Sequence, residues 1–509
     1  MFVLGILIGI YSYIIFFLGV NGLLHQSLAL PLTVFFIFVL LYTFKSGIKL
    51  SWKYSKTGVF FLTLLFAQAG VNLIGVLGPE LSFDSLWYHL TLPKLYIQNH
   101  SITYIPGWLM YYYAMPKLVE ILYTAVLLLS NEIVVKLLHY IFGILILIVI
   151  YKIAQKYLNK TYALAACVIF YSNLVVGWMS TTAYVDLART FFELLTFSAF
   201  LIFIDKKENK YLYLSAIMMG LTISTKLIAV GSFLIYIPLL IKKPRQLISF
   251  LLISLLIPLP WFVFSFLHTG NPIYPLFSGY PLENNVLHLL NPFNFIEELW
   301  GLLIHSQDPL SPIYLIFVPL ICLYLGKFKK QEKLFAYYSL FGLLIWYFTP
   351  RTGGGRFILP YLPVGSILVL MTIEKLSNSI KKYSFVLIVF IALVLIGYRS
   401  FANKKYIPVI LGNQTKSDFL AKNLNFKFGD FYDIDGYFAK KIKPTDMVLI
   451  YGIHNLYYVN FPFIHESYLK KGDWFNYILI GEGMIPKRYS NWQLIYQNDI
   501  SRVKLYALP

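Results

Sequence analysis

Thirteen apolar runs, each about 15 to 21 residues long, constrain the fold of this chain more than any other feature. About 20 apolar residues in a helix cross the roughly 30 Å hydrocarbon core of a bilayer. Only 13% of the residues are charged, against roughly 25% in soluble proteins. We therefore predict an all-α polytopic membrane protein with about thirteen transmembrane helices. The runs cover approximately residues 2–20, 27–44, 57–77, 133–151, 161–178, 186–204, 211–225, 227–241, 246–266, 312–326, 334–349, 357–373 and 383–400.

Basic residues are concentrated in six short gaps between these runs, which hold 20 of the 42 lysines and arginines. The positive-inside rule places such gaps in the cytoplasm. The gap 267–311 contains no lysine or arginine and belongs on the other side. The net charge of +19 first suggests a nucleic-acid partner. The distribution of the basic residues is largely a topology signal, however, so that interpretation loses its support and no nucleic-acid partner is expected. With thirteen spans, the N-terminus is expected inside and the C-terminus outside, in a plasma (inner) membrane.

The run 211–241 has basic gaps on both sides, so the chain must cross an even number of times between them. Two helices of about 15 residues satisfy this requirement. Each would be roughly 22 Å long, shorter than the hydrocarbon core. We therefore expect a hairpin whose tip, near Thr225 and Lys226, lies below the outer surface.

The last part of the chain, 401–509, contains no spanning run. Met447–Tyr451, Tyr477–Ile480 and Val503–Ala507 have the composition of short strands. The sequence predicts two domains: a membrane domain over 1–400 and a small extracytoplasmic α/β domain over 401–509.

Charged residues beside membrane spans are costly and usually functional. The first outer gap contains Glu80, Asp84 and His89, and Phe83 to Leu90 has the spacing of an amphipathic interfacial helix. Asp84 stands at the start of that helix as a cap, a catalytic carboxylate or both. His89 is expected to contact a partner or substrate rather than a metal.

A second cluster comprises Asp186, Arg189 and Glu193, at helical spacings of three and four. It is either a self-neutralised ladder or a group with Asp186 facing an outer site. Lys226, at the hairpin tip, either snorkels outward or holds a lipid phosphate.

The fourth cluster is a basic turn that contains Arg351, Arg356 and three glycines on the outer side. It is either a flexible surface turn or a phosphate site, since guanidinium groups and backbone amides both suit phosphate. Together, the four clusters place carboxylates and cations at one outer surface. This inventory suits transfer of a group from a lipid phosphate, with a base for the acceptor and cations for the leaving group.

The order of these motifs resembles the GT-C superfamily of membrane glycosyltransferases, especially the protein O-mannosyltransferases and the lipid A aminoarabinose transferases. Four segments carry the resemblance: Phe83-Asp84-Ser-Leu-Trp-Tyr-His89-Leu, Ala183-Tyr-Val-Asp186, Gly220-Leu-Thr-Ile-Ser-Thr-Lys226 and Arg356-Phe-Ile-Leu-Pro-Tyr-Leu-Pro363. The mannosyltransferases have an Asp-Glu pair where this chain has Asp84 followed by Ser85.

The resemblance implies an inverting hexosyl- or pentosyltransferase with a polyprenyl-phosphate-linked sugar donor and a lipid, glycan or protein acceptor. Asp84 would be the base, and Asp186 would bind or orient. Lys226, Arg356 and Arg351 would hold the phosphate. Substrate-binding roles fall to Glu80, Tyr88, His89 and Tyr184, while the loop 267–311, with Glu297, Glu298, His268, His288 and His305, would cover the acceptor.

The sequence predicts no metal ligands, although a divalent metal remains open as a helper. Two alternative functions also remain open. One is a transporter or flippase of a lipid-linked sugar, which needs the same phosphate cations. The other is a glycan polymerase or ligase, which shares the donor.

Overall fold

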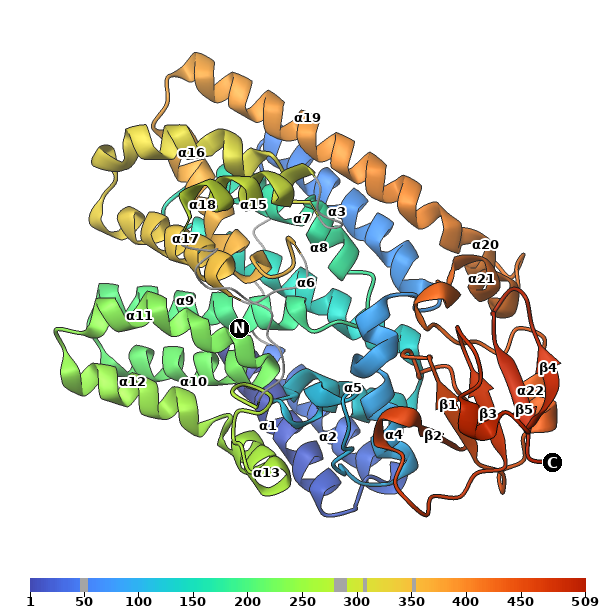
Figure 1. Cartoon of the computed structure of the whole chain (residues 1–509). Helices are drawn as coiled ribbons and strands as arrows, with labels where there is room; N and C mark the ends of the chain where they lie inside the picture. The colour runs from blue at the N-terminus through green and yellow to red at the C-terminus, as the bar shows by residue number, and fades with distance from the viewer. Residues whose placement is uncertain (46–53, 279–290, 305–308, 350–353) are drawn as a thin grey trace.

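The structure is a computed structural model that describes residues 1–45, 54–278, 291–304, 309–349 and 354–509. It is a helical bundle with a small sheet domain at one end (Figure 1). The longer helices are α1 Phe2–Val20, α2 Gln26–Phe44, α3 Lys56–Leu77, α5 Leu118–Leu129, α6 Glu132–Ala154, α7 Lys160–Tyr171, α9 Asp186–Lys206, α10 Asn209–Thr225, α12 Pro244–Leu256, α13 Leu259–Thr269, α15 Pro292–Ile304, α16 Ile313–Tyr324, α17 Lys330–Phe348, α18 Leu362–Glu374 and α19 Asn378–Asn403.

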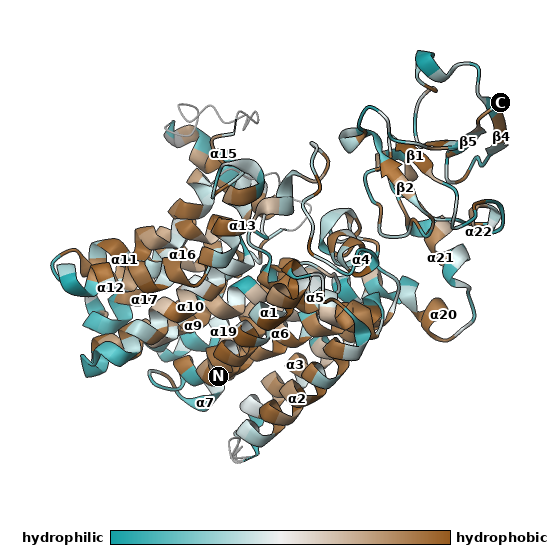
Figure 2. Cartoon of the chain, turned by 90° about the horizontal axis from the view of Figure 1, so that it is seen from below, coloured by the Kyte–Doolittle hydropathy of each residue, from teal (hydrophilic) through white to brown (hydrophobic). Residues whose placement is uncertain are grey.

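Every predicted apolar run falls on a helix or on two successive helical segments. In Figure 2, hydrophobic residues run along the helices of the bundle, and hydrophilic residues gather at many helix ends. Among the described residues, six helices are long and apolar enough to cross a membrane, or seven if the bent pair α12–α13 counts as one span. The chain is therefore an integral membrane protein, and the figure of thirteen crossings stays a prediction.

Several runs are broken helices rather than single straight ones. The run 246–266 bends by 58° between α12 and α13, where Pro258 and Pro260 lie. Proline has no backbone N–H to donate and its ring crowds the preceding turn, so a continuous helix is disfavoured there. The number of long apolar runs in the sequence is therefore larger than the number of straight, unbroken spanning helices.

The predicted break at the tip of the hairpin is present. Helix α10 ends at Thr225, and Lys226 has extended backbone angles. A 3₁₀ segment, Leu227–Ser232, and α11, Phe233–Leu240, follow it. Lys226 therefore stands at a helix end, where its side chain is not committed to the face of a continuous helix.

The segment Phe83 to Leu90 is largely helical, as predicted, but Leu86 and Leu90, two of the apolar side chains expected to face the interface, are buried. The structure has a short π-helix over Ser85–His89, followed by α4, Thr91–Gln98. Leu86 packs against residues of the C-terminal part, including Tyr406 and Phe419. Leu86 and Leu90 of the predicted apolar stripe are therefore covered by protein, whereas Phe83 is 39% exposed.

The C-terminal part forms a five-stranded sheet in the order β2-β1-β3-β5-β4. β1 pairs in parallel with β2 and β3, whereas β5 pairs antiparallel with β3 and β4. The three predicted strands correspond to β1, β3 and β5, while the sequence analysis missed β2, which has three residues, and β4, which is largely exposed. The strands are β1 Val448–Tyr451, β2 Phe463–His465, β3 Tyr477–Ile480, β4 Gln493–Gln497 and β5 Lys504–Ala507.

One segment of this C-terminal part, 456–459, lies against the first outer loop. The Lys94 ammonium donates to the carbonyl oxygens of Leu456, Tyr457 and Val459. In the other direction, the Tyr458 hydroxyl donates to the backbone carbonyl of Glu80 at 2.9 Å. These contacts fix the loop that contains Asp84 against the sheet domain. The domain boundary at residue 400 stays a prediction, and α19 continues to Asn403.

The orientation of the chain is testable by cysteine labelling in a variant that lacks Cys322. Lys471 and Lys329 are both exposed, so each accepts a cysteine without loss of buried contacts. A membrane-impermeant maleimide added outside intact cells should modify Lys471→Cys and leave Lys329→Cys unmodified until the cells are opened. If only Lys329→Cys were modified in intact cells, the result would contradict the predicted topology and indicate the opposite orientation.

Candidate active site

Two ion pairs bring together four residues from separate parts of the chain. Arg356 Nη1 lies 2.5 Å from Asp84 Oδ2, and Lys226 Nζ lies 2.8 Å from Asp186 Oδ1. The two pairs are neighbours, because both cations stand near the ring of Phe357: Lys226 at 5.1 Å and Arg356 at 5.0 Å from its centroid. Four of the charged residues singled out by the sequence therefore form one cluster whose formal charges cancel.

Two charges of this cluster stand where an α-helix begins or ends. Asp186 is the first residue of α9, and Lys226 caps the C-terminus of α10. These places suit their charges, because a helix favours anions at its N-terminus and cations at its C-terminus. Arg356 precedes a 3₁₀ turn, Leu359–Tyr361, that leads into α18. The broken helices thus allow polar groups to gather inside the bundle.

Asp84 does not act as a helix cap in this structure. It precedes the π-helix, but its side chain makes no capping hydrogen bond. Its carboxylate accepts from Arg356 and, at 3.4 Å, from the Tyr88 hydroxyl, while its backbone N–H donates to the Tyr184 hydroxyl at 3.2 Å. Within the described residues, Oδ1 of Asp84 has no hydrogen-bond partner, so it can accept a proton from a further group.

The two carboxylates differ in accessibility. The side chain of Asp84 is 12% exposed, whereas that of Asp186 is fully buried. The second oxygen of Asp186 is buried and has no hydrogen-bond partner among the described residues. An incoming molecule can therefore reach Asp84 directly, while Asp186 is placed to hold Lys226.

Arg356 is fixed by aromatic as well as acidic groups. Its guanidinium lies 5.3 Å from the Tyr184 ring centroid and also faces Phe357. Burial opposes its charge, but Asp84 and Asp186 together raise the pKa of Arg356 above its usual value. The positive charge is therefore present at every physiological pH.

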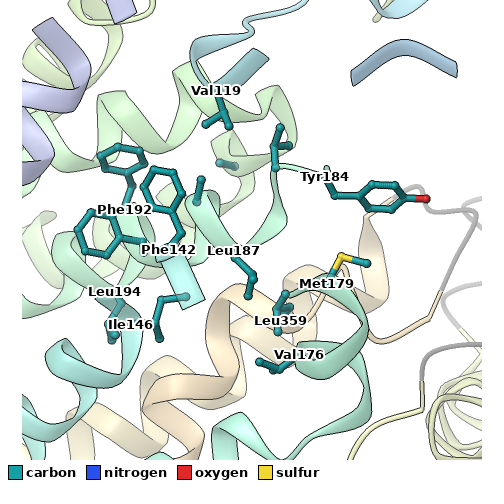
Figure 3. Packing of buried hydrophobic residues seen from close by; sticks show 14 of the residues in the cluster. Val119, Phe142, Ile146, Val176, Met179, Tyr184, Leu187, Phe192, Leu194 and Leu359 are labelled. Atoms are coloured by element: carbon teal, nitrogen blue, oxygen red, sulfur yellow. The ribbon is translucent and has the colours of Figure 1, made fainter. Parts of the chain in front are cut away.

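Tyr184 also marks the border between the site and the apolar core. Figure 3 shows it at the edge of the packed side chains that include Leu187, Phe142 and Leu359, with its hydroxyl directed away from them. The ring is buried, and the hydroxyl accepts from the backbone of Asp84. Tyr184 and Tyr88, both predicted to bind substrate, thus contact the candidate catalytic carboxylate or its backbone.

Glu80, also predicted to bind substrate, has its carboxylate occupied by backbone groups. Oε1 accepts from the N–H groups of Leu81 and Ser82 at 2.9 and 2.8 Å, and Oε2 accepts from Ala183 N at 2.6 Å. The residue is 1% exposed. It joins the loop that contains Asp84 to the segment just before Asp186. In this structure Glu80 therefore fixes the relative position of the two carboxylates.

His89 lies behind the site, in a group that the sequence analysis missed. Its Nδ1 is 2.9 Å from Oε1 of Glu120, and both side chains are buried. Lys117, also buried, places its ammonium 5.5 Å from the centroid of the Tyr88 ring. The sequence did contain a signal for this group: Lys117 and Glu120 are two charged residues at the start of an apolar stretch, 118–129. This stretch is too short to count as a membrane span.

Some predicted residues lie elsewhere. Arg351, His288 and His305 are outside the described residues. His268, at the end of α13, stacks on Tyr104 of the first outer loop at 5.5 Å. Glu297 and Glu298 lie on α15. Within the part of the chain that the structure describes, no three His, Cys, Asp or Glu side chains are grouped as metal ligands.

Comparisons with known proteins give one family match and several matches to solved structures. Residues 114–265 match a family described as dolichyl-phosphate-mannose-protein mannosyltransferase. The chain shares its fold with ArnT from Cupriavidus metallidurans in the apo state: the TM-score is 0.61 at 11% identity, covering 88% of this chain and 97% of ArnT. ArnT bound to undecaprenyl phosphate matches with a TM-score of 0.57 at 12% identity, covering 89% of this chain and 98% of ArnT.

A more distant match is the Archaeoglobus fulgidus oligosaccharyltransferase tethered to an acceptor peptide. Its TM-score is 0.43 at 13% identity, covering 80% of this chain and 64% of that one. No curated protein sequence matches the chain. The resemblance to the GT-C membrane glycosyltransferases is confirmed by the family match and by the shared fold with ArnT.

The position of Glu80 generates a prediction that separates a structural role from substrate binding. In Glu80→Gln, an amide N–H₂ replaces one acceptor oxygen, so at least one backbone N–H loses its acceptor and the others keep only a neutral one. Hydrogen bonds to charged groups contribute about 1.5–3 kcal/mol. We expect a clear fall in the temperature of unfolding in detergent, with Glu482→Gln, an exposed site, as the control. Unchanged stability together with weaker substrate binding would instead favour the substrate role.

Proposed function

We propose that the chain is an integral membrane glycosyltransferase. It moves a sugar from a polyprenyl-phosphate donor to an acceptor hydroxyl on the outer side of the plasma (inner) membrane, with inversion. The observation that carries this proposal is the cluster of two acid–base ion pairs, Asp84–Arg356 and Asp186–Lys226, in a chain with the fold of ArnT. Related proteins support the donor class, because ArnT is known bound to undecaprenyl phosphate.

The donor phosphate would bind between Lys226 and Arg356, with Arg351, five residues earlier in the sequence, as a further contact. Guanidinium and ammonium groups form strong charge-assisted bonds with phosphate oxygens. Without donor, both cations are neutralised by carboxylates. A phosphate oxygen competes for the same N–H groups, so donor binding loosens the pairs. Lys117, a buried cation near Tyr88, is close enough to add to the positive field.

The reaction is a displacement at the anomeric carbon of the sugar. The acceptor oxygen forms a new bond to this carbon on the face opposite the phosphate. The bond from this carbon to the phosphate oxygen breaks, and its electron pair stays on the polyprenyl phosphate. The cations stabilise that growing negative charge, which is where preorganised electrostatics contribute most. Attack from the opposite face inverts the configuration.

Asp84 takes the proton of the acceptor hydroxyl as the new bond forms. Its Oδ2 atom accepts a hydrogen bond from Arg356, and a phosphate that draws the guanidinium away would free this oxygen as well. Donor binding would thus make the carboxylate more available to the acceptor hydroxyl. Asp186 stays with Lys226 and orients it toward the phosphate.

A transporter or flippase for a lipid-linked sugar would use the same cations. It would have no need for a carboxylate oxygen without a partner at the accessible side of the pair, which Asp84 provides. We therefore favour chemistry over transport. The assay below would identify the sugar and would show whether the acceptor is a lipid, a glycan or a protein.

The base assignment is tested by Asp84→Asn. This change removes the proton acceptor and leaves the shape of the residue unchanged. General-base catalysis contributes about 10²–10⁴-fold, so we expect turnover to fall by at least two orders of magnitude. Purified protein would be incubated with a panel of undecaprenyl-phosphate-linked hexoses and pentoses and candidate acceptors. Release of undecaprenyl phosphate would be measured by mass spectrometry.

The same variant should bind undecaprenyl phosphate at least as well as the parent, because Arg356 no longer has a carboxylate partner. Asp499→Asn, at an exposed position in the sheet domain, is the control and should behave as the parent. Parent-like turnover in Asp84→Asn would exclude Asp84 as the base and make Asp186 the next candidate. Donor movement across vesicles without sugar transfer would favour the transporter.

The phosphate-binding role of Lys226 is tested by Lys226→Ala. A charge-assisted bond contributes about 1.5–3 kcal/mol, which corresponds to about 10–150-fold in affinity. We expect binding of undecaprenyl phosphate to weaken within this range, measured by titration calorimetry in detergent. Lys375→Ala is a matched control, because Lys375 is 18% exposed, Lys226 is 19% exposed, and both form an ion pair. Equal loss of phosphate binding in both variants would assign Lys226 to folding alone.

A further inference from the structure

A buried hydrogen-bond network lies one to two helical turns along α9 from the charged cluster. The Ser232 hydroxyl donates to Oε2 of Glu193 at 2.8 Å, and its oxygen lies 2.9 Å from the Tyr361 hydroxyl. The Tyr338 hydroxyl donates to Oε1 of Glu193 at 3.2 Å. Arg189 Nη2 donates to the Tyr361 hydroxyl at 3.4 Å. We call these five residues the Glu193 network.

The members of the Glu193 network come from the same segments as the charged residues of the site. Glu193 is seven residues after Asp186 on α9. Ser232 is six residues after Lys226, and Tyr361 is five residues after Arg356. Each hydrogen bond that joins two of these members therefore also ties together two of the segments that hold the site.

The network differs from the self-neutralised ladder that the sequence left open. In the described part of the chain, Arg189 forms no ion pair with Asp186 or Glu193, and its Nε has no hydrogen-bond partner. Hydroxyl groups from other segments satisfy the Glu193 carboxylate instead. All five members are buried. A buried carboxylate with partners on two other segments is a connection between segments, since loss of either partner leaves one of its oxygens unsatisfied.

We propose that the Glu193 network, through Tyr361 and Ser232, sets the distance between Arg356 and Lys226 and thereby preorganises the phosphate site. This inference rests on the proposed function and concerns positioning residues, which do not touch the substrate. Lys226 and Arg356 both stand at helix breaks and are within electrostatic range of each other, so their like charges favour separation. A rigid connection behind them opposes that separation.

A phosphate binds most tightly when both cations are already at the spacing that its oxygens require. Any movement needed on binding reduces the affinity by the cost of ordering the site. Once the donor is bound, the chemical step depends on Asp84 and the leaving group, which the network does not contact. The proposal therefore predicts weaker donor binding with a nearly unchanged rate at saturation.

The test compares Tyr361→Phe with Tyr338→Phe. Both changes remove one hydroxyl from the same network and leave the ring in place. Tyr361 lies five residues after Arg356, whereas Tyr338 lies in the middle of α17, on a helix without any of the four charged residues. The second variant is thus a control for the stability cost of losing a buried hydroxyl from the network.

We expect Tyr361→Phe to weaken binding of undecaprenyl phosphate about three- to tenfold, the value of one buried hydrogen bond. KM for the donor should rise by a similar factor, with kcat within about twofold of the parent. Tyr338→Phe should lower the unfolding temperature to a similar extent and leave donor binding unchanged. Ser232→Ala should reproduce the effect of Tyr361→Phe.

Three outcomes would overturn the inference: equal weakening by Tyr361→Phe and Tyr338→Phe, no weakening by either, or a fall in kcat at unchanged donor KM. The first would make the network purely structural. These outcomes are distinct from failure of the proposed function, which would appear as absence of undecaprenyl phosphate binding and of sugar transfer in the parent protein.

Discussion

Neutralisation of charge inside a largely apolar bundle is the constraint on which the rest of the site depends. An isolated charge at this depth is costly, and the cost falls when an opposite charge and hydrogen bonds accompany it. Asp186 is fully buried and has Lys226 as its partner, while Asp84 has Arg356. The partners come from segments 40 and 272 residues away, so the pairs also fix the bundle around the site.

This neutrality makes the site responsive to its substrate. In the proposed reaction, a donor phosphate brings negative charge that competes with both carboxylates for the cations. The same competition that binds the donor would free the Asp84 carboxylate for the acceptor hydroxyl. In the proposed reaction, the residues of the two ion pairs are thus also the residues that act on the substrates.

Backbone connections determine how accurately these charges meet. Glu80 joins the loop of Asp84 to the segment before Asp186, and segment 456–459 covers that loop from the sheet domain. The Glu193 network connects the segments of Lys226 and Arg356. Both connections use a buried carboxylate surrounded by N–H or O–H donors, which fixes geometry through several short bonds. The sheet domain therefore contributes to the site although none of its residues belongs to the charged cluster.

The sequence alone determined the membrane character, the positions of the helices, three of the five strands and the four charged residues of the cluster, because hydropathy and misplaced charge are local signals. It could not determine their pairing. Whether Asp84 caps a helix or pairs with Arg356, and whether Glu80 meets substrate or backbone, depends on groups more than 100 residues distant. It also predicted that the apolar stretch around Leu86 lies in the membrane interface, whereas Leu86 packs against the C-terminal part. Burial against protein and burial against lipid select the same side chains, so only the tertiary structure could distinguish them.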